Sequence, residues 1–124
     1  MNDDIFGTVT FDNGWIKDKS ISLWGKEFKI LVMATAYYEH ETITDEQRTA
    51  YNAFLNKRKS LMNKIEKLLD DYMEEPEKRL CPRFLVFEKN GKYALLFDDV
   101  KEPDDGVAVQ LSPIEKVMSQ DAYL

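Results

Sequence analysis

The first residues of the chain alternate between the two sides of an extended backbone, which is typical of a strand with one buried face. Residues 5–11 predict such a strand, and the side chains expected on its buried face are Ile5, Gly7, Val9 and Phe11. The Asn13-Gly14 pair that follows tolerates the positive φ angles of a tight hairpin turn. We therefore expect residues 15–24 to return antiparallel to the first strand.

A second turn, near Gly25, leads into residues 28–37, where both sides of the extended backbone become apolar. One face carries alternate hydrophobic residues from Phe28 onward, and Leu31 and Met33 make the other face apolar too. A strand that is covered on both faces belongs in the middle of a sheet. The first 38 residues thus predict a three-stranded antiparallel meander.

The hydrophobic period changes from two to the helical period after Thr44. Thr44 and Gln47 form the sequence of a capping box, which marks the start of a helix. The spacing predicts either one long helix over residues 44–72 or two helices broken near Asn56, with an end close to Pro76. The residues expected to face the sheet are Tyr51, Phe54, Leu55, Met62, Ile65 and Leu69.

The strand pattern resumes in the last third of the chain. Residues 84–87 and 93–97 flank an Asn-Gly turn at residues 89–92, which is the clearest hairpin of the sequence. A further strand is expected over residues 106–111, and residues 113–124 carry no pattern that assigns them to an element.

These elements predict one α+β domain over residues 1–124, with a six-stranded, mostly antiparallel sheet. Three strands precede the helix or helix pair, and three follow it. The apolar helix stripe is expected to pack on the sheet. A strongly curved sheet or an open barrel around the helix is the alternative, and the sequence does not separate the two.

The composition supports a folded core and restricts the partners. Hydrophobic residues make up 44% of the 124 residues and aromatic residues 12%, which is too rich in core formers for a disordered chain. The net charge of −6, from 17 basic and 23 acidic residues, repels nucleic acid and favours a protein with a basic surface as partner. Neither a secretory signal nor a stretch long enough to span a membrane is present, so we expect a cytoplasmic protein that binds no membrane. The oligomeric state stays open.

Residue types that carry catalysis or bind metals are scarce in this sequence. One histidine and one cysteine exclude the usual zinc sets, and the single Cys81 excludes an internal disulfide. His40 lies between Glu39 and Glu41 without a nucleophile nearby, so we interpret it as a polar loop residue. We interpret Cys81 as a small hydrophobic residue that packs against its neighbours. We expect no enzyme, no cofactor and no metal site.

The candidate binding residues are mainly acidic. One group lies in a loop whose spacing does not fit a calcium-binding EF-hand, so it is interpreted as a solvated loop that meets a basic partner: Asp98, Asp99, Glu102, Asp104 and Asp105. A second group crowds the end of the helix, where the helix dipole disfavours negative charge: Asp70, Asp71, Glu74 and Glu75. Among the aromatic residues, Trp24 beside its turn is expected to be partly exposed and available for binding.

Several scattered motifs resemble those of a family of small, uncharacterised bacterial proteins. They are Ile5-Phe6-Gly7-x-Val9-x-Phe11-x-x-Gly14-Trp15, Leu23-Trp24-Gly25-Lys26, Gln47-x-x-x-Tyr51-x-x-Phe54-Leu55 and the closing Ser119-Gln120-Asp121-Ala122-Tyr123-Leu124. The motifs consist of turn and core residues and contain no catalytic signature, so the resemblance implies a shared fold. Related families are suspected immunity proteins against polymorphic toxins.

The leading hypothesis is therefore a protein-binding domain, in the narrower form an immunity protein that neutralises a basic toxin through its acidic loops. The alternatives are an interaction or scaffold domain of another role and a small ligand-binding domain that uses the sheet face.

Overall fold

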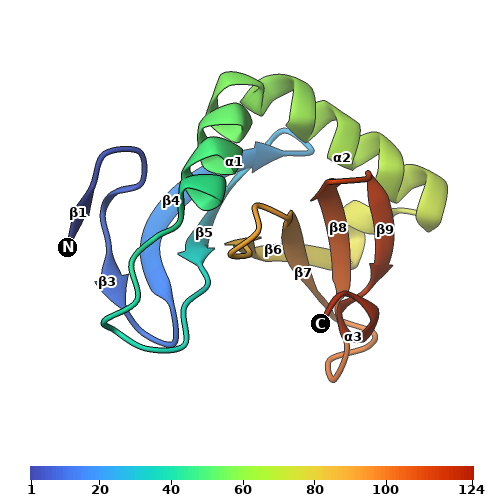
Figure 1. Ribbon diagram of the computed structural model, residues 1–124. Coiled ribbons are helices and arrows are strands. Elements are labelled where there is room, and N and C mark those ends of the chain that lie inside the picture. The colour runs from blue at the N-terminus through green and yellow to red at the C-terminus, as the bar shows by residue number, and fades with distance from the viewer.

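The computed structural model describes residues 1–124 and contains one large sheet with a pair of helices on one side (Figure 1). The sheet has seven strands: β3 (Thr10–Phe11), β4 (Trp15–Leu23), β5 (Lys26–Ala34), β6 (Leu80–Phe87), β7 (Tyr93–Asp99), β8 (Val107–Ser112) and β9 (Lys116–Ser119). Two very short strands form a separate hairpin: β1 (Asn2–Asp3) and β2 (Gly7–Thr8). The helices are α1 (Asp45–Asn56), α2 (Arg58–Tyr72), the 3₁₀ turn η1 (Pro76–Lys78) and α3 (Gln120–Tyr123).

The strands lie side by side in chain order from β3 to β9. Neighbouring strands are antiparallel with one exception, because β5 and β6 run parallel. A parallel pair needs a crossover connection, and α1 and α2 supply it. The fold thus consists of two antiparallel meanders joined edge to edge at the parallel β5–β6 pair, which makes it α+β as expected.

The prediction of six strands is wrong by one. The seventh strand, β9, lies in the segment that the sequence pattern left unassigned, and it pairs antiparallel with β8 from Val107↔Ser119 to Gln110↔Lys116. The alternative of a strongly curved sheet or barrel is also wrong, because the sheet is open and ends in β3 and β9. Four residues with mixed polarity are too few to show a strand period.

The helical segment forms two helices, which was one of the two alternatives that the sequence left open; the other was a single long helix. The Thr44 side chain accepts a hydrogen bond from the backbone of Gln47, and the Gln47 side chain accepts one from the backbone of Thr44, so the capping box is present. Lys57 leaves the helical conformation, with φ −116° and ψ 17°, and separates α1 from α2. Five of the six expected core residues of this segment are buried, whereas Leu55 is only half-buried and borders an open groove.

The first strand departs most from the prediction. Residues 5–11 do not form one strand, because the chain folds back on itself in the β1–β2 hairpin. The Asp3 carboxylate accepts hydrogen bonds from the backbone N–H groups of Ile5 and Phe6, at 3.0 and 2.9 Å, and fixes this turn. The turn directs Phe6 into the core, where it is 1% exposed, while Ile5 stays half-buried.

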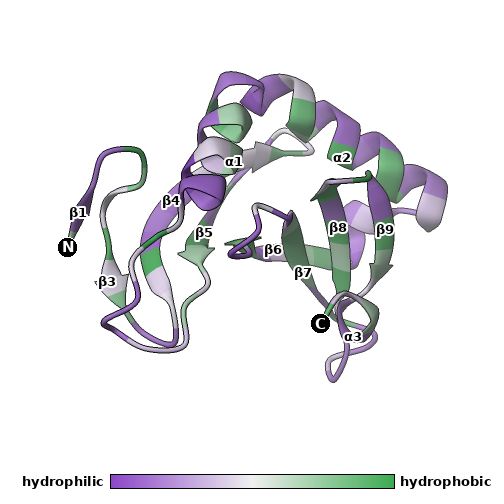
Figure 2. Cartoon of the chain, in the orientation of Figure 1, coloured by the Kyte–Doolittle hydropathy of each residue, from purple (hydrophilic) through white to green (hydrophobic).

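The main core lies between the helix pair and the sheet, and Figure 2 shows hydrophobic residues along both. A smaller apolar cluster covers the opposite face of the sheet around Val86, Ala94, Leu96 and Ala108. Tyr123 of α3 closes this second cluster. β7 therefore has apolar neighbours on both faces, which is typical of a central strand.

Candidate functional site

The chain just after the first acidic segment, at Arg79, lies beside the start of the second acidic segment, at Asp99 and Val100. β6 and β7 pair in a register that places Leu80 opposite Asp99, so the residues just before β6 lie beside those just after β7. The backbone N–H of Val100 donates a hydrogen bond to the carbonyl of Arg79, at 3.0 Å. We call the two acidic segments together the acidic end, and its members are Asp70, Asp71, Glu74, Glu75, Asp98, Glu102, Asp104 and Asp105.

Asp99 is not a member of the acidic end, which corrects its interpretation as a solvated loop residue. It is 4% exposed, and its two carboxylate oxygens accept hydrogen bonds from Nε and Nη2 of Arg79, at 2.9 and 2.7 Å. The hydrogen bond from Arg79 holds the pKa of the Asp99 carboxyl below its usual range. Asp99 closes strand β7 and is inward-facing, so it joins the two segments instead of contacting a partner.

The other acidic side chains are exposed to different degrees and pair little. Asp98 forms an exposed ion pair with Arg83 at 2.7 Å, and Glu75 forms one with Lys78 at 3.2 Å. Asp105 is half-buried and accepts a hydrogen bond from the backbone of Asp121. The remaining five are fully exposed and take part in no ion pair: Asp70, Asp71, Glu74, Glu102 and Asp104. Negative charge therefore accumulates here and is only partly compensated.

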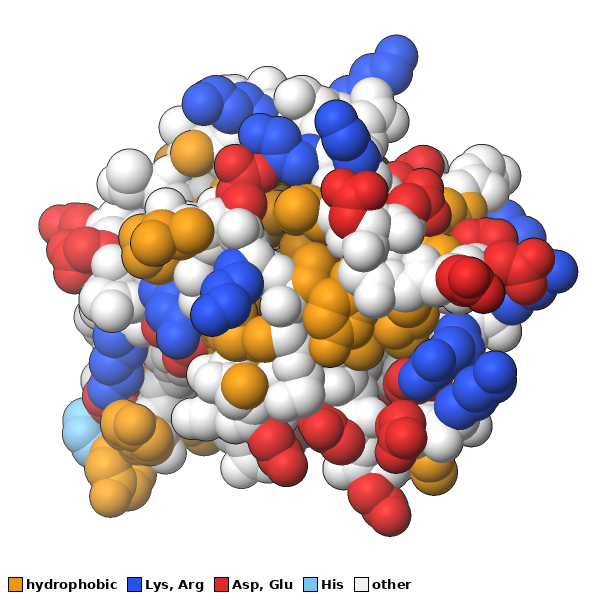
Figure 3. Space-filling view, turned by 90° about the vertical axis from the view of Figure 1, so that its right-hand side faces the viewer, with side chains coloured by type: hydrophobic (Ala, Val, Ile, Leu, Met, Phe, Trp, Pro, Cys, Tyr) orange, Lys and Arg blue, Asp and Glu red, His pale blue; other side chains and the backbone are white.

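Two exposed apolar side chains stand within the acidic end. Tyr72, the last residue of α2, is 50% exposed, and Val100, beside the Arg79 carbonyl, is 72% exposed. The pKa of Arg79 is raised mainly by its hydrogen bond to Asp99, and the smaller effects of Glu102 and Tyr72 indicate that both lie within electrostatic range of Arg79. Figure 3 faces the end of α2 and shows acidic side chains at its lower and right-hand margins, with Lys and Arg side chains among them and hydrophobic side chains nearer the centre. Sequence reasoning missed both residues, since an isolated apolar residue at an element's end carries no signal.

Trp24 is half-buried, as expected, but it is not part of the acidic end. It sits at the β4–β5 turn with a positive φ of 52°, and its backbone N–H donates to Glu66 of α2 at 3.1 Å. Its ring packs edge-on against Phe28 and tilted against Phe97, with centroid distances of 6.4 and 6.2 Å. The indole mainly closes the core beneath α2.

The residues with catalytic or metal-binding chemistry do not converge. His40 is exposed and stacks on Tyr38, with ring centroids 5.4 Å apart. Cys81 is half-buried in β6, and no three His, Cys, Asp or Glu side chains come close enough together to hold a metal ion. A groove of about 1050 Å³ is open and lies between the helix pair and the β6–β7 and β8–β9 turns.

Comparisons with known proteins identify a family but no activity. The family model of a domain of unknown function, DUF6985, matches residues 5–121. No curated protein and no solved structure matches the chain. The helices themselves are too short or too polar to cross a membrane.

Proposed function

We propose that the chain, which belongs to the DUF6985 family, is a protein-binding domain whose acidic end docks on a basic surface of a partner protein. One observation carries the proposal: two acidic segments about thirty residues apart in sequence are connected through the Arg79–Asp99 pair, and each carries an exposed apolar side chain, Tyr72 in the first and Val100 in the second. Charged rims with a few apolar anchors are common in protein interfaces, and tyrosine is frequent among the anchors.

The placement of these charges has a cost for the fold. Asp70 and Asp71 stand in the last turn of α2, at the negative end of the helix dipole, and this turn has no basic residue. Glu74 and Glu75 follow after the helix has ended at Tyr72 and add to the negative charge there. A role outside folding explains why this cost is tolerated. A net negative field accelerates association with an oppositely charged protein.

In its narrower form, the proposal identifies the partner as a basic toxin and the chain as its immunity protein. The sequence resembles a family of small, uncharacterised bacterial proteins whose related families are suspected immunity proteins, and this relation and the negative charge of the acidic end support this form. The prediction is that the captured basic partner arrests growth when expressed alone, and that co-expression of this chain restores growth. A partner that is harmless alone supports a scaffold or interaction role instead.

Affinity capture from native cell lysate, followed by mass spectrometry, tests the proposal with two matched variants. The first neutralises the acidic end with Asp71→Asn, Glu74→Gln and Glu102→Gln. The second neutralises three exposed carboxylates elsewhere, which take part in no ion pair: Asp12→Asn, Glu27→Gln and Glu39→Gln. Both variants lose the same negative charge, so only the position of the charge differs.

The parent and the second variant are expected to retain the same basic protein, and the first variant is expected to lose it. Retention of that protein by all three, or its loss from both variants alike, contradicts docking at the acidic end. In either case the specific arrangement of these carboxylates is not what the partner recognises.

A further inference from the structure

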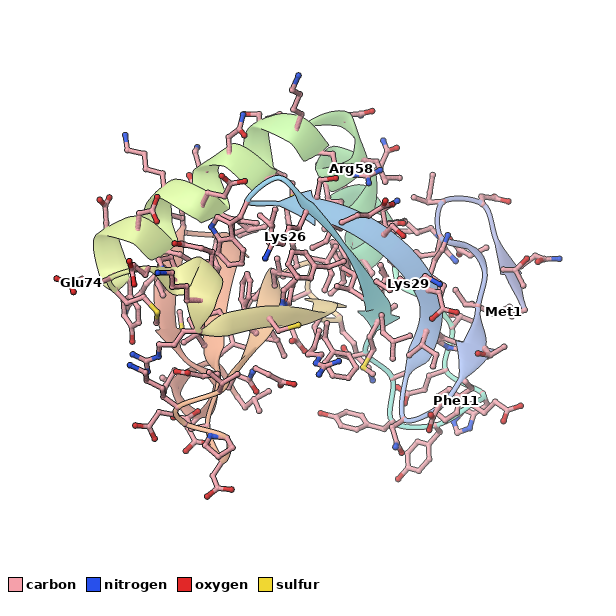
Figure 4. The ribbon with its side chains drawn as sticks, turned by 180° about the vertical axis from the view of Figure 1, so that it is seen from behind. Met1, Phe11, Lys26, Lys29, Arg58 and Glu74 are labelled. Carbon is pink, nitrogen blue, oxygen red and sulfur yellow. The ribbon has the colours of Figure 1, made fainter.

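The sheet ends in two edge strands, β3 and β9, and they differ in what lies beside them. The N-terminal hairpin flanks β3: the amino group of Met1 donates to the carbonyl oxygen of Val9 at 3.1 Å, and the Val9 N–H donates to the Met1 carbonyl oxygen at 2.9 Å (Figure 4). β9 pairs with β8 on one side, and no strand pairs with its other side. A free edge presents backbone N–H and C=O groups and invites pairing with another chain.

One hydrogen bond fixes which backbone groups of β9 point away from the sheet. The N–H of Gln120 donates to the carbonyl oxygen of Gly106, at 3.0 Å, and this pair continues the β8–β9 register. Hydrogen-bonded and non-bonded pairs alternate along an antiparallel ladder, so every second residue back from Gln120 bonds to β8. The N–H and C=O groups of Val117 and Ser119 therefore point to the free edge. None of these four groups forms a hydrogen bond with another part of the chain.

Opposite charges stand at the two ends of this edge. Lys116 begins β9, is exposed and takes part in no ion pair. Asp121 follows the other end of the strand and is likewise exposed and without an ion pair. The backbone N–H of Asp121 donates to the carboxylate of Asp105 at 3.3 Å, so a second acidic side chain lies beside it. The edge thus runs from a cation to two carboxylates.

The two central side chains of β9 are apolar and lie on opposite faces of the sheet. Val117 packs against the main core, and Met118 packs against the smaller cluster on the other face. Both are half-buried, so each leaves apolar surface open. Figure 3 looks onto the side of the molecule where β9 lies in Figure 1, and hydrophobic side chains gather near the centre of this view. The edge therefore offers apolar contacts besides its backbone groups.

We propose that β9 pairs with the β9 of a second copy of this chain, antiparallel and about a two-fold axis. Only one register uses all four free backbone groups: Val117 lies opposite the partner's Ser119, and each of the two equivalent pairs exchanges two hydrogen bonds. The axis then passes between the two Met118 side chains, and the two sheets become one. A two-fold interface must be complementary to itself, and this edge is so in backbone groups, apolar side chains and charge.

The same register brings the unpaired charges together. Lys116 lies opposite the partner's Gln120, so its long side chain reaches the partner's Asp121 at the next residue. Lys116 shares its face of the sheet with Met118, and α3 packs on that face through Tyr123. The lysine and the aspartate therefore meet on one face. The two-fold axis repeats the contact, which makes two ion pairs in each dimer.

Sedimentation equilibrium of the whole chain, from about 10 μM to 1 mM at constant salt, tests the proposal. The parent is expected to show a monomer–dimer equilibrium with a dissociation constant between about 1 μM and 1 mM, because four backbone hydrogen bonds and a few side chains make a small interface. Lys116→Glu and Asp121→Lys each place like charges opposite each other twice in the dimer. Each is expected to raise the dissociation constant roughly tenfold or more.

The control variant is Lys29→Glu, which changes the net charge as much as Lys116→Glu does. Lys29 is exposed on β5, which β6, β7 and β8 separate from β9 (Figure 4). The control is expected to leave the dissociation constant within about twofold of the parent value, because salt screens charges at that distance. Should Asp121→Lys disturb α3, the comparison of Lys116→Glu with Lys29→Glu decides the outcome.

An equimolar mixture of Lys116→Glu and Asp121→Lys gives the most specific result. In a mixed dimer, the introduced glutamate faces the introduced lysine, and the remaining Lys116 faces the remaining Asp121. The mixture is therefore expected to dimerise about as tightly as the parent, although neither variant does so alone.

Three results would overturn the proposal. A parent that stays monomeric up to about 1 mM would leave the β9 edge to a strand of a different protein. Equal dissociation constants for Lys116→Glu and Lys29→Glu would mean that dimerisation uses another surface or depends on net charge alone. A mixture that associates no better than the separate variants would exclude the contact between Lys116 and the partner's Asp121 and, with it, the antiparallel pairing.

Discussion

Gln47 offers the sharpest test of how the helix pair is attached to the sheet. Its side chain is completely buried and joins three segments at the start of α1. The side-chain oxygen accepts a hydrogen bond from the backbone N–H of Thr44, at 2.8 Å. The side-chain nitrogen donates to the carbonyl oxygens of Thr35 and Phe87, at 3.1 and 2.9 Å. These two carbonyls follow directly after β5 and end β6, so Gln47 fastens α1 to the parallel strand pair.

The substitution Gln47→Leu removes these three hydrogen bonds while nearly preserving the side-chain volume. The Phe87 carbonyl keeps one partner, because it also accepts from the backbone N–H of Thr35 at 3.0 Å. The Thr44 N–H and the Thr35 carbonyl lose the Gln47 partner. An unsatisfied buried group costs about 1 to 3 kcal/mol, so the free energy of unfolding is expected to fall by about 2 to 5 kcal/mol.

The assay is equilibrium unfolding in urea, followed by the fluorescence of the two tryptophans. Gln110→Leu is the matched control, because the Gln110 side chain donates one exposed hydrogen bond to the carbonyl of Ile114, at 2.8 Å. This control is expected to change the free energy of unfolding by less than about 1 kcal/mol. If Gln47→Leu is no more destabilising than Gln110→Leu, Gln47 does not attach the helix pair to the sheet.

Three further predictions concern stability. Ile65 is fully buried, so Ile65→Ala is expected to lower the free energy of unfolding by about 2 to 5 kcal/mol. Leu55 is half-buried, so Leu55→Ala is expected to lower it by less than half as much. Equal losses of unfolding free energy in urea would contradict the packing described here. Asp99→Asn is expected to lower the urea midpoint of unfolding clearly, because it breaks a buried ion pair with Arg79. Asp98→Asn breaks only an exposed pair and is expected to change the midpoint hardly at all. The reverse order would refute the stabilising role of the Arg79–Asp99 pair. Burial alone would raise the pKa of Asp3, but hydrogen bonds from Phe6 and Arg48 lower it, so its stabilisation is present at neutral pH and is lost as pH falls below about 4. Between pH 7 and pH 2, the melting temperature of Asp3→Asn should fall less steeply than that of the parent. Identical slopes of melting temperature against pH would exclude a contribution of the Asp3 carboxylate to stability.

Local signals in the sequence predicted the elements whose geometry depends on a few adjacent residues. The Thr44 and Gln47 pair predicted the capping box because both bonds of that motif form within one helical turn. The Asn90-Gly91 pair predicted the β6–β7 turn, where Gly91 adopts a φ of 89°. The basic, polar run after Asn56 predicted the helix break, which the structure places at Lys57.

Features that depend on distant pairing were beyond sequence reasoning. The parallel contact of β5 with β6 joins segments about fifty residues apart, and no local pattern encodes it. The approach of the chain before β6 to the chain after β7 follows from the β6–β7 register and from the Arg79–Asp99 pair, and the sequence does not indicate that pair. The alternation pattern gave the wrong side for Phe6, because the side-chain carboxylate of Asp3 fixes a turn of the backbone within the predicted strand.

The most direct test of the proposed function is the association rate constant with the captured basic protein, measured by stopped flow at about 20 and 150 mM salt. Because the field of the acidic end steers the encounter, the parent is expected to associate fastest and to slow most as salt rises. The variant with Asp71→Asn, Glu74→Gln and Glu102→Gln is expected to associate more slowly and with a weaker salt dependence. The control with three carboxylates neutralised elsewhere is expected to stay close to the parent. Equal rates and equal salt dependence in all three proteins would contradict binding through the acidic end.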